Sequence, residues 1–143
     1  MPVNITELDD GLGNLIKGEG HVTGIEFFNA LSGLASKPEE QLKKYIYSIS
    51  DYTEISGSDV ALDYLYKSAL VMNDFAKINP DILIVIAATD HIAYNLAKLW
   101  SFIANTTGWH VSVFKTRKDL NIWLEEKLNK EDSNIHFEFD KNL

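Results

Sequence analysis

The chain has 143 residues, of which 45% are hydrophobic, and it carries a formal net charge of −8 and no cysteine. A chain of this length forms one domain and can bury a core without disulfides or bound metal. The absence of cysteine excludes disulfides, thiolate metal sites and thiol nucleophiles, and it favours a cytoplasmic protein. The negative charge argues against binding of nucleic acid or anionic membrane surfaces, which attract Lys and Arg. We also expect no signal peptide and no membrane insertion, because the apolar runs are too short to span a bilayer.

The chain is expected to open with a β-hairpin, formed by residues 3–8 and 12–17 around the turn signal at 9–11. Thr23, with Glu26 three residues later, forms a capping box and predicts the start of a helix. The apolar stripe expected on that helix consists of Ile25, Phe28, Leu31 and Leu34.

A third strand is expected over residues 45–50, which alternate apolar and polar side chains. Residues 51–58, rich in Ser, Thr and Gly, are interpreted as a polar loop. Ser58 is the expected cap of a long helix that ends near Ile78, before Asn79-Pro80. The predicted apolar stripe of this helix is Leu62, Leu65, Ala69 and Met72.

The run 81–89 is continuously apolar and β-branched, which predicts a strand buried on both faces. A helix follows from Asp90, and its expected apolar stripe is Ile92, Leu96, Leu99 and Ile103. A fifth strand is expected over 109–114, and Thr116 is the predicted cap of a last helix that reaches Leu128.

The resulting element order is β-β-α-β-α-β-α-β-α, which predicts an α/β (α+β-like) fold with a mixed four- to six-stranded sheet and helices packed on it. Residues 1–128 form the expected single domain, and 129–143 form a C-terminal extension. Within the extension, residues 135–139 alternate as an additional edge strand would, and an apolar edge strand favours a homodimer contact.

This order, and several features between residues 82 and 124, resemble the SpoIIAA-like group of STAS domains, the fold of anti-sigma-factor antagonists. Ile82–Asp90 is similar to that group's fourth strand and the turn after it, and residues 93–99 to its third helix. Residues 111–114 and 120–124 are similar to its fifth strand and closing helix, and the Trp123-Leu124 pair is the most telling detail.

The resemblance implies a regulatory or ligand-binding module rather than an enzyme. In STAS antagonists a Ser or Thr at the start of the helix after the third strand is phosphorylated, and this chain offers Thr53, Ser56 and Ser58 there. The usual Asp-Ser-Ser-Gly signature is absent, with Ser56-Gly57 in its place. Other members of the wider group are similar to lipid-binding modules, in which an apolar groove between helix and sheet takes an acyl chain.

Two segments are candidate binding sites on chemical grounds. Backbone N–H groups at a helix start favour an anion near 51–58, although Ser58 can equally be a simple cap beside a solvated turn. His91 beside Asp90 can act as a neutral base, although a capping Asp with an exposed His is the plainer interpretation. The binding residues we expect are Asp51, Thr53, Ser56, Ser58, Thr89, Asp90, His91 and Tyr94.

An alternative hypothesis is a Mg²⁺-dependent, receiver-like phosphotransfer protein. Asp9-Asp10, Asp51, Thr89 and Lys115 follow successive predicted strands, in a way similar to the site residues of receiver domains. A receiver needs a helix directly after the acidic pair, whereas a hairpin strand is expected here. The four His residues share no metal-ligand spacing, and no P-loop, dinucleotide motif or nucleophile triad is present. We therefore expect no cofactor, no metal and no catalysis.

The leading hypothesis is a non-catalytic module that docks a protein partner or a lipid-like apolar small molecule. The expected location is the segment 51–58 together with the helix that starts at Asp90.

Overall fold

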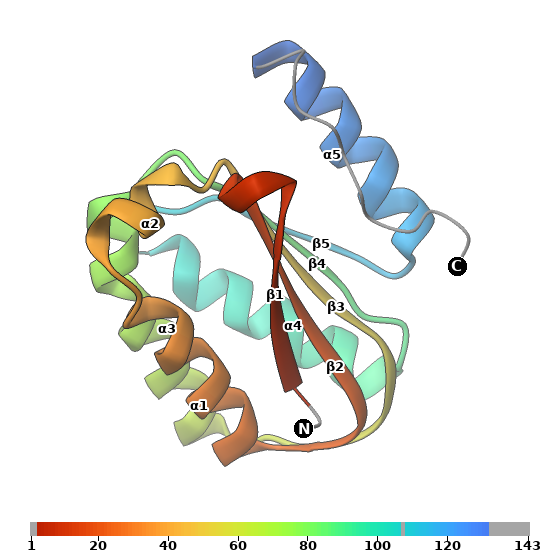
Figure 1. The fold of residues 1–143 in the computed structure, drawn as a ribbon. Coiled ribbons are helices and arrows are strands. Elements are labelled where there is room, and N and C mark those ends of the chain that lie inside the picture. The colour runs from red at the N-terminus through yellow and green to blue at the C-terminus, as the bar shows by residue number, and fades with distance from the viewer. Residues whose placement is uncertain (1–2, 107, 132–143) are drawn as a thin grey trace.

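The computed structural model of the protein describes residues 3–106 and 108–131. They form a single sheet with helices on both faces, as Figure 1 shows. The helices and strands are β1 (Val3–Leu8), β2 (Gly13–Thr23), α1 (Gly24–Ala35), α2 (Glu39–Lys44), β3 (Tyr47–Asp59), α3 (Leu62–Ile78), β4 (Leu83–Ala87), α4 (His91–Asn105), β5 (Val111–Phe114) and α5 (Arg117–Glu131).

The sheet is mixed, as predicted. Its strands lie in the order β1-β2-β3-β4-β5; β1 pairs antiparallel with β2, and every other neighbouring pair is parallel. The predicted N-terminal hairpin is confirmed. Its turn, Asp9–Gly11, is tight enough to need positive φ angles of 51°, 54° and 87°, which Asp and Gly adopt at less cost than other residues.

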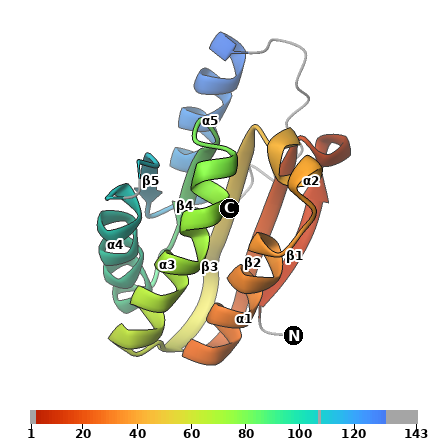
Figure 2. The same ribbon diagram turned by 90° about the vertical axis from the view of Figure 1, so that its left-hand side faces the viewer.

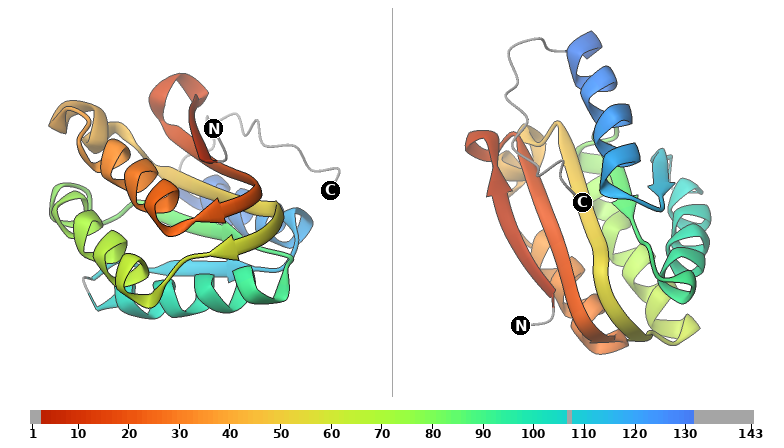
Figure 3. Two further views of the ribbon diagram at one scale, coloured as in Figure 1. Left: turned by 90° about the horizontal axis from the view of Figure 1, so that it is seen from below. Right: turned by 90° about the vertical axis from the view of Figure 1, so that its right-hand side faces the viewer.

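The helices form two unequal layers (Figures 2 and 3). Helices α1, α3 and α4 cover one face of the sheet, and α5 packs on the opposite face. Strand β4, which lies between β3 and β5, is buried on both faces, as predicted. Its Ile84 and Ile86 belong to the larger cluster under α1, α3 and α4, while Val85 and Ala87 belong to the cluster under α5.

The prediction of a loop at 51–58 is wrong, because β3 continues without a break to Asp59. Strand β2 also continues past the predicted end at Lys17 to Thr23. The pairing of β3 with β4 stops at Asp51, so the outer half of β3 pairs only with β2. That two-stranded ribbon has its register shifted twice by bulge-like irregularities, and an extension with one partner can carry polar residues of the kind that also typify loops.

The start of the third helix also differs from the prediction. Helix α3 begins at Leu62, its N-cap is Ala61 without a side-chain cap, and Ser58 still belongs to β3. The expected cap at Ser58 is therefore wrong. Leu65, Ala69 and Met72 are buried as predicted, whereas Leu62 remains 66% exposed because the first turn of the helix extends beyond the core.

The predicted stripe of α4 is displaced by one position around the helix. Ile92 and Leu99 are 59% and 40% exposed. The residues that face the sheet are Ala93, Ala97, Trp100, Ser101 and Ala104. Alanines let the helix lie close to the sheet, and the larger aliphatic side chains then fall at its flank. In α1, Leu31 and Leu34 are buried as predicted, whereas Phe27 is buried in place of Phe28 and Ile25 is exposed.

The remaining predictions concern two helix caps, the segment before β3 and the C-terminal residues. The capping box of Thr23 and Glu26 is confirmed, and Thr116 caps α5 by accepting from the amide of Asp119 at 3.1 Å. The fragment Glu39–Lys44 forms an additional short helix, α2, that was not expected. The predicted edge strand at 135–139, and with it the dimer contact, lies outside the described residues. Within the described ranges, no helix combines the length and apolar character needed to cross a membrane.

Candidate binding cavity

A cavity lies between the sheet and the helices α1, α3 and α4. The cavity volume is about 50 Å³, counted as the space that the centre of a water molecule can occupy. One water molecule needs roughly 10–15 Å³ on this measure. The lining of the cavity consists of Ile16, Val22, Phe27, Leu31, Ser48, Ser50, Tyr52, Ile55, Ser58, Val60, Leu65, Met72, Phe75, Ile84, Ile86, Ala93, Leu96, Ala97 and Trp100.

Small residues create this space. Ser48 and Ser50 occupy two helix-facing positions on β3, and Ala93 and Ala97 occupy the positions opposite them on α4. Larger neighbours hold the layers apart, among them Trp100, whose indole Nε1 donates to Ser68 Oγ of α3 at 3.2 Å. Interiors are normally packed with few voids larger than a water molecule, so a cavity of this size is a specific feature of this core.

The cavity lining comes nearest to solvent at three residues. All of its lining residues are buried except Ser58, Val60 and Leu96, which are half-buried. Its mouth therefore lies between the β3–α3 connection and α4. Exposed apolar side chains adjoin it, because Ile92 and Leu99 lie one helical turn on either side of Leu96.

Besides Ser58 at the mouth, the cavity wall has three side chains with hydroxyl groups, all from one row of β3. Ser48, Ser50 and Tyr52 alternate along the strand and face the same side of the sheet. Burial raises the pKa of Tyr52 to about 12, although a hydrogen bond from Ser50 acts in the opposite direction. Ser48 Oγ donates to Oδ1 of Asn14 on β2 at 2.6 Å. The sequence predicted alternating side chains over residues 45–50. It could not predict Asn14 as the partner of Ser48, because that requires knowing that β2 and β3 pair.

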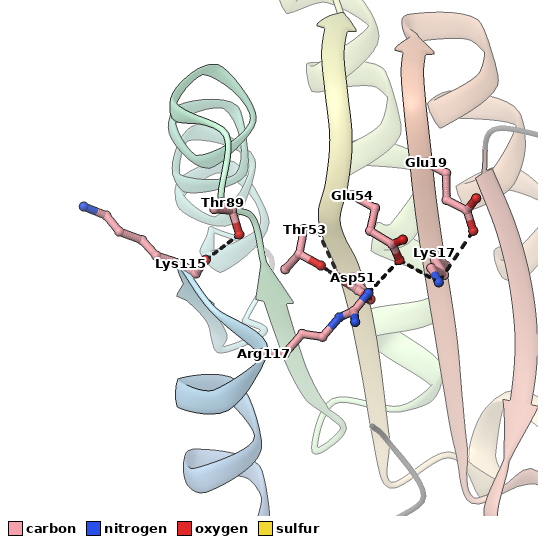
Figure 4. Close-up of polar contacts among 8 residues, drawn as sticks. All are labelled: Lys17, Glu19, Asp51, Thr53, Glu54, Thr89, Lys115 and Arg117. Atoms are coloured by element: carbon pink, nitrogen blue, oxygen red, sulfur yellow. Dashed lines mark hydrogen bonds and ion pairs between the residues drawn. The ribbon is translucent and has the colours of Figure 1, made fainter. Parts of the chain in front are cut away.

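The opposite face of the sheet holds a chain of charged residues (Figure 4). Arg117, at the start of α5, reaches past β4 to β3, where it donates through Nε to Asp51 Oδ2 at 2.8 Å and through a terminal NH2 to Glu54 Oε2 at 2.7 Å. Glu54 also accepts from Lys17 of β2 at 2.7 Å, and Lys17 lies 3.5 Å from Glu19. This network ties the last helix to the two longest strands.

The carboxylate of Asp51 is fully engaged within this network. The residue is 1% exposed, and its second oxygen accepts from the backbone amide of Thr53 at 3.0 Å and from the Thr53 hydroxyl at 2.7 Å. Hydrogen bonds from Lys17 and then Arg117 lower the pKa of Glu54. The pKa of Arg117 is raised because its bonds to Asp51 and Glu54 outweigh the opposing effect of burial. The arrangement therefore serves as a structural clamp.

Arg117 was not among the residues selected from the sequence. It is the chain's only arginine, which is the one signal that could have drawn attention to it. Arginine is the residue best suited to bridge two carboxylates, here the buried Asp51 and the exposed Glu54.

The other predicted residues lie apart from one another. Asp90 caps α4 by accepting from the amide of Ala93 at 3.1 Å, and His91 is exposed beside Asn95, which is the plainer of the two interpretations. Ser58 lines the mouth of the cavity, whereas Ser56 is exposed on the β2–β3 ribbon.

Tyr94 and Thr89 lie at the sheet edge near β5. The ring of Tyr94 lies under the ammonium groups of Lys98 and Lys115, 5.9 and 5.1 Å from its centroid. The hydroxyl of Thr89 donates to the backbone carbonyl of Lys115 at 2.8 Å.

The receiver-like constellation is not assembled. Asp9 and Asp10 follow β1 at the amino ends of the parallel strands, where Tyr47 donates a hydrogen bond to Asp9. Thr89 and Lys115 follow β4 and β5 at the opposite, carboxyl ends, and Figure 4 shows the Lys115 side chain pointing away from Asp51. Within residues 3–106 and 108–131, no three His, Asp or Glu side chains gather as metal ligands would.

Comparison of the chain with models of known protein families, with curated proteins and with solved structures finds no match. The resemblance to STAS domains therefore stays a prediction, and the functional argument depends on the geometry of the chain itself.

Proposed function

We propose that the protein is a non-catalytic, STAS-like module that binds a small apolar molecule in the cavity under α1, α3 and α4. The cavity itself is the observation that carries the proposal, because it is lined mainly by apolar side chains and nearly all of its lining residues are buried. Apolar pockets with a few placed polar groups are the usual form of small-molecule sites. The mouth also adjoins the two segments that sequence patterns favoured, through Ser58 and the first turns of α4.

Binding would proceed by transfer of the ligand from water into the space bordered by Met72, Ala97 and Trp100. Removal of apolar surface from water drives this step, at roughly 25 cal/mol per Å². For a small apolar ligand, dissociation constants on the order of millimolar to micromolar are expected. The half-buried Leu96 and Val60 would move most as the ligand passes, because they border the mouth.

The proposal is tested by titrating the protein with methylenecyclohexane, a compact hydrocarbon, and following the indole N–H signals by NMR. Trp100 lines the cavity, whereas Trp123 packs on Phe114 on the other side of the sheet and serves as an internal reference. We expect a saturable shift of the Trp100 signal and none of the Trp123 signal.

The substitution Ala97→Leu fills the cavity from α4 and should abolish this shift while the protein stays folded. Ala30→Leu is the matched control, since it adds the same isobutyl group on α1 outside the lining. Equal binding by Ala97→Leu and the wild type, or no saturable shift in the wild type, would contradict the proposal.

A further inference from the structure

The cavity wall carries two neighbouring hydroxyl groups on one strand. Ser50 and Tyr52 line the cavity from β3, and both residues are buried, with exposed fractions of 6% and 8%. Their side chains lie on the helix-facing side of the sheet, because Asp51 between them contacts Arg117 on the opposite side. A ligand that occupies the cavity therefore comes within reach of these two side chains.

Apolar side chains surround this pair. Ser50 pairs with Ile16 of β2 and Ile86 of β4, and both isoleucines line the cavity as well. The ring of Tyr52 packs edge-on against Phe27 of α1, with the ring centroids 6.2 Å apart. An aliphatic residue would be the usual choice between two isoleucines on a buried face of a sheet. A serine there widens the cavity and adds a polar group to its wall.

The two hydroxyls have more hydrogen-bonding capacity than they use on each other. Burial raises the pKa of Tyr52 to about 12, so its phenol is protonated at neutral pH, and Ser50 donates a hydrogen bond to the phenol oxygen. A hydroxyl has one proton to donate and two lone pairs with which to accept. One bond between two hydroxyls therefore leaves the phenol proton for a further acceptor. Because the phenol oxygen itself accepts a bond, its O–H group is polarised and becomes a stronger donor.

The described lining of the cavity is also free of charge. Among the described residues that line it, none is Asp, Glu, Lys, Arg or His. A ligand carboxylate or ammonium placed there would be a buried charge without a counter-ion, which is far more costly than a buried neutral oxygen that accepts a hydrogen bond.

We infer that the ligand is a neutral molecule with a compact apolar body and one carbonyl or hydroxyl oxygen, which accepts a hydrogen bond from the Tyr52 hydroxyl beside Ser50. The apolar body contacts the helix side of the cavity, which includes Met72, Ala97 and Trp100. Carboxylates are rejected. This inference rests on the proposed function and names the ligand class of the same cavity.

The test uses three probes of similar shape: cyclohexanone, methylenecyclohexane and cyclohexanecarboxylate. Each is titrated against the wild type and against Tyr52→Phe, which removes only the phenol oxygen, with the Trp100 indole signal as readout. In the wild type both neutral probes bind, and the carboxylate does not bind at pH 7. In Tyr52→Phe the affinity for the ketone falls about threefold to tenfold, because one hydrogen bond is lost, while the affinity for the alkene changes less than about twofold.

Tyr64→Phe is the matched control, because it removes the same group from a half-buried tyrosine of α3 that lies outside the cavity lining. It should leave the ratio of ketone to alkene affinity unchanged. A second readout uses the wild type alone and decides the question if Tyr52→Phe fails to fold. The NMR signal of Tyr52 Cζ, the ring carbon that bears the hydroxyl, should shift more with the ketone than with the alkene.

The outcomes separate the two proposals. If the alkene binds but the affinity ratio is the same in Tyr52→Phe, or the Tyr52 Cζ signal responds equally to both neutral probes, the assigned ligand class is wrong and the apolar site stands. Binding of the carboxylate as tight as that of the ketone overturns the inference as well. If neither neutral probe binds to the wild type, the proposed function itself fails.

Discussion

At the scale of single residues, Arg117 and Asp51 form an ion pair in which both side chains are buried. Their side chains are 4% and 2% exposed and are joined at 2.7 Å. Two charges removed from water stabilise a fold only while both are present, because either one alone is left uncompensated. The pair therefore makes the fold depend on both residues.

We predict that Arg117→Met lowers the free energy of unfolding by about 3–5 kcal/mol, since it leaves the Asp51 carboxylate buried without its cation. Urea denaturation at pH 7 measures the loss. Lys17→Met is the control: it removes a partly exposed ion pair with Glu54, worth at most about 1 kcal/mol. Equal costs for the two variants would show that the Arg117–Asp51 pair does not hold the fold.

Whether a contact between two residues could be predicted depends on how far apart the two residues lie in the sequence. The cap at Asp90 and the box at Thr23 could be predicted, because their hydrogen-bond partners lie three residues away. Arg117 and Asp51 lie 66 residues apart, and Asn14 and Ser48 lie 34 apart. No local pattern encodes such pairs, since they depend on which strands become neighbours.

At the scale of elements, the sequence allowed two interpretations of Asp90: a partner of His91 acting as a base, or a cap of the following helix. The structure shows it as the cap of α4. As a cap, its side chain needs only an oxygen that accepts from the amide of Ala93. Asp90→Ala should therefore lower the free energy of unfolding by about 1 kcal/mol, whereas Asp90→Asn, which keeps the oxygen, should cost only a few tenths. Thermal or urea unfolding measures both. A large loss in Asp90→Asn would mean that the charge, and not the cap, is what the helix requires.

Apart from the short helix α2, the order of the elements was predictable, and element boundaries and faces were less so. Strand β4 was recognised because a strand buried on both faces has no polar positions. The outer half of β3 was missed because it has a single neighbouring strand and can therefore carry Ser, Thr and Gly. In α4 the predicted stripe was right only in part: Leu96 and Ile103 pack against the core, whereas the closest contact is made through alanines.

At the scale of the whole molecule, two carboxylates connect segments that are distant in sequence. Glu54 joins β3 to Lys17 and Arg117. Glu7 of β1 accepts from Lys37, Gln41 and Tyr45 at 2.5, 2.8 and 2.5 Å, which anchors the edge strand to the α1–α2 region. Burial acts to raise the pKa of Glu7, but the hydrogen bonds of Lys37 and Tyr45 outweigh it and lower the pKa. The pKa of Glu54 is lowered as well.

Acid should therefore weaken the fold through these two groups. A carboxyl whose pKa is depressed by folding releases its proton more readily in the native state, so its contribution is present above the ordinary value of 4.5 and is lost as the pH falls through the lowered pKa. We predict that the double variant Glu7→Gln/Glu54→Gln is less stable than the wild type at pH 7, and that the difference shrinks as the pH falls below 4.5, as measured by urea unfolding across the acid range. Glu40→Gln/Asp74→Asn changes the net charge equally at exposed positions and should retain the wild-type pH dependence. Acid also relieves repulsion in a chain with a net charge of −8, and the control variant separates that effect from the hydrogen bonds and ion pairs of Glu7 and Glu54. If the free energy of unfolding of the Glu7/Glu54 variant depends on pH as that of the wild type does, neither carboxylate stabilises the native state.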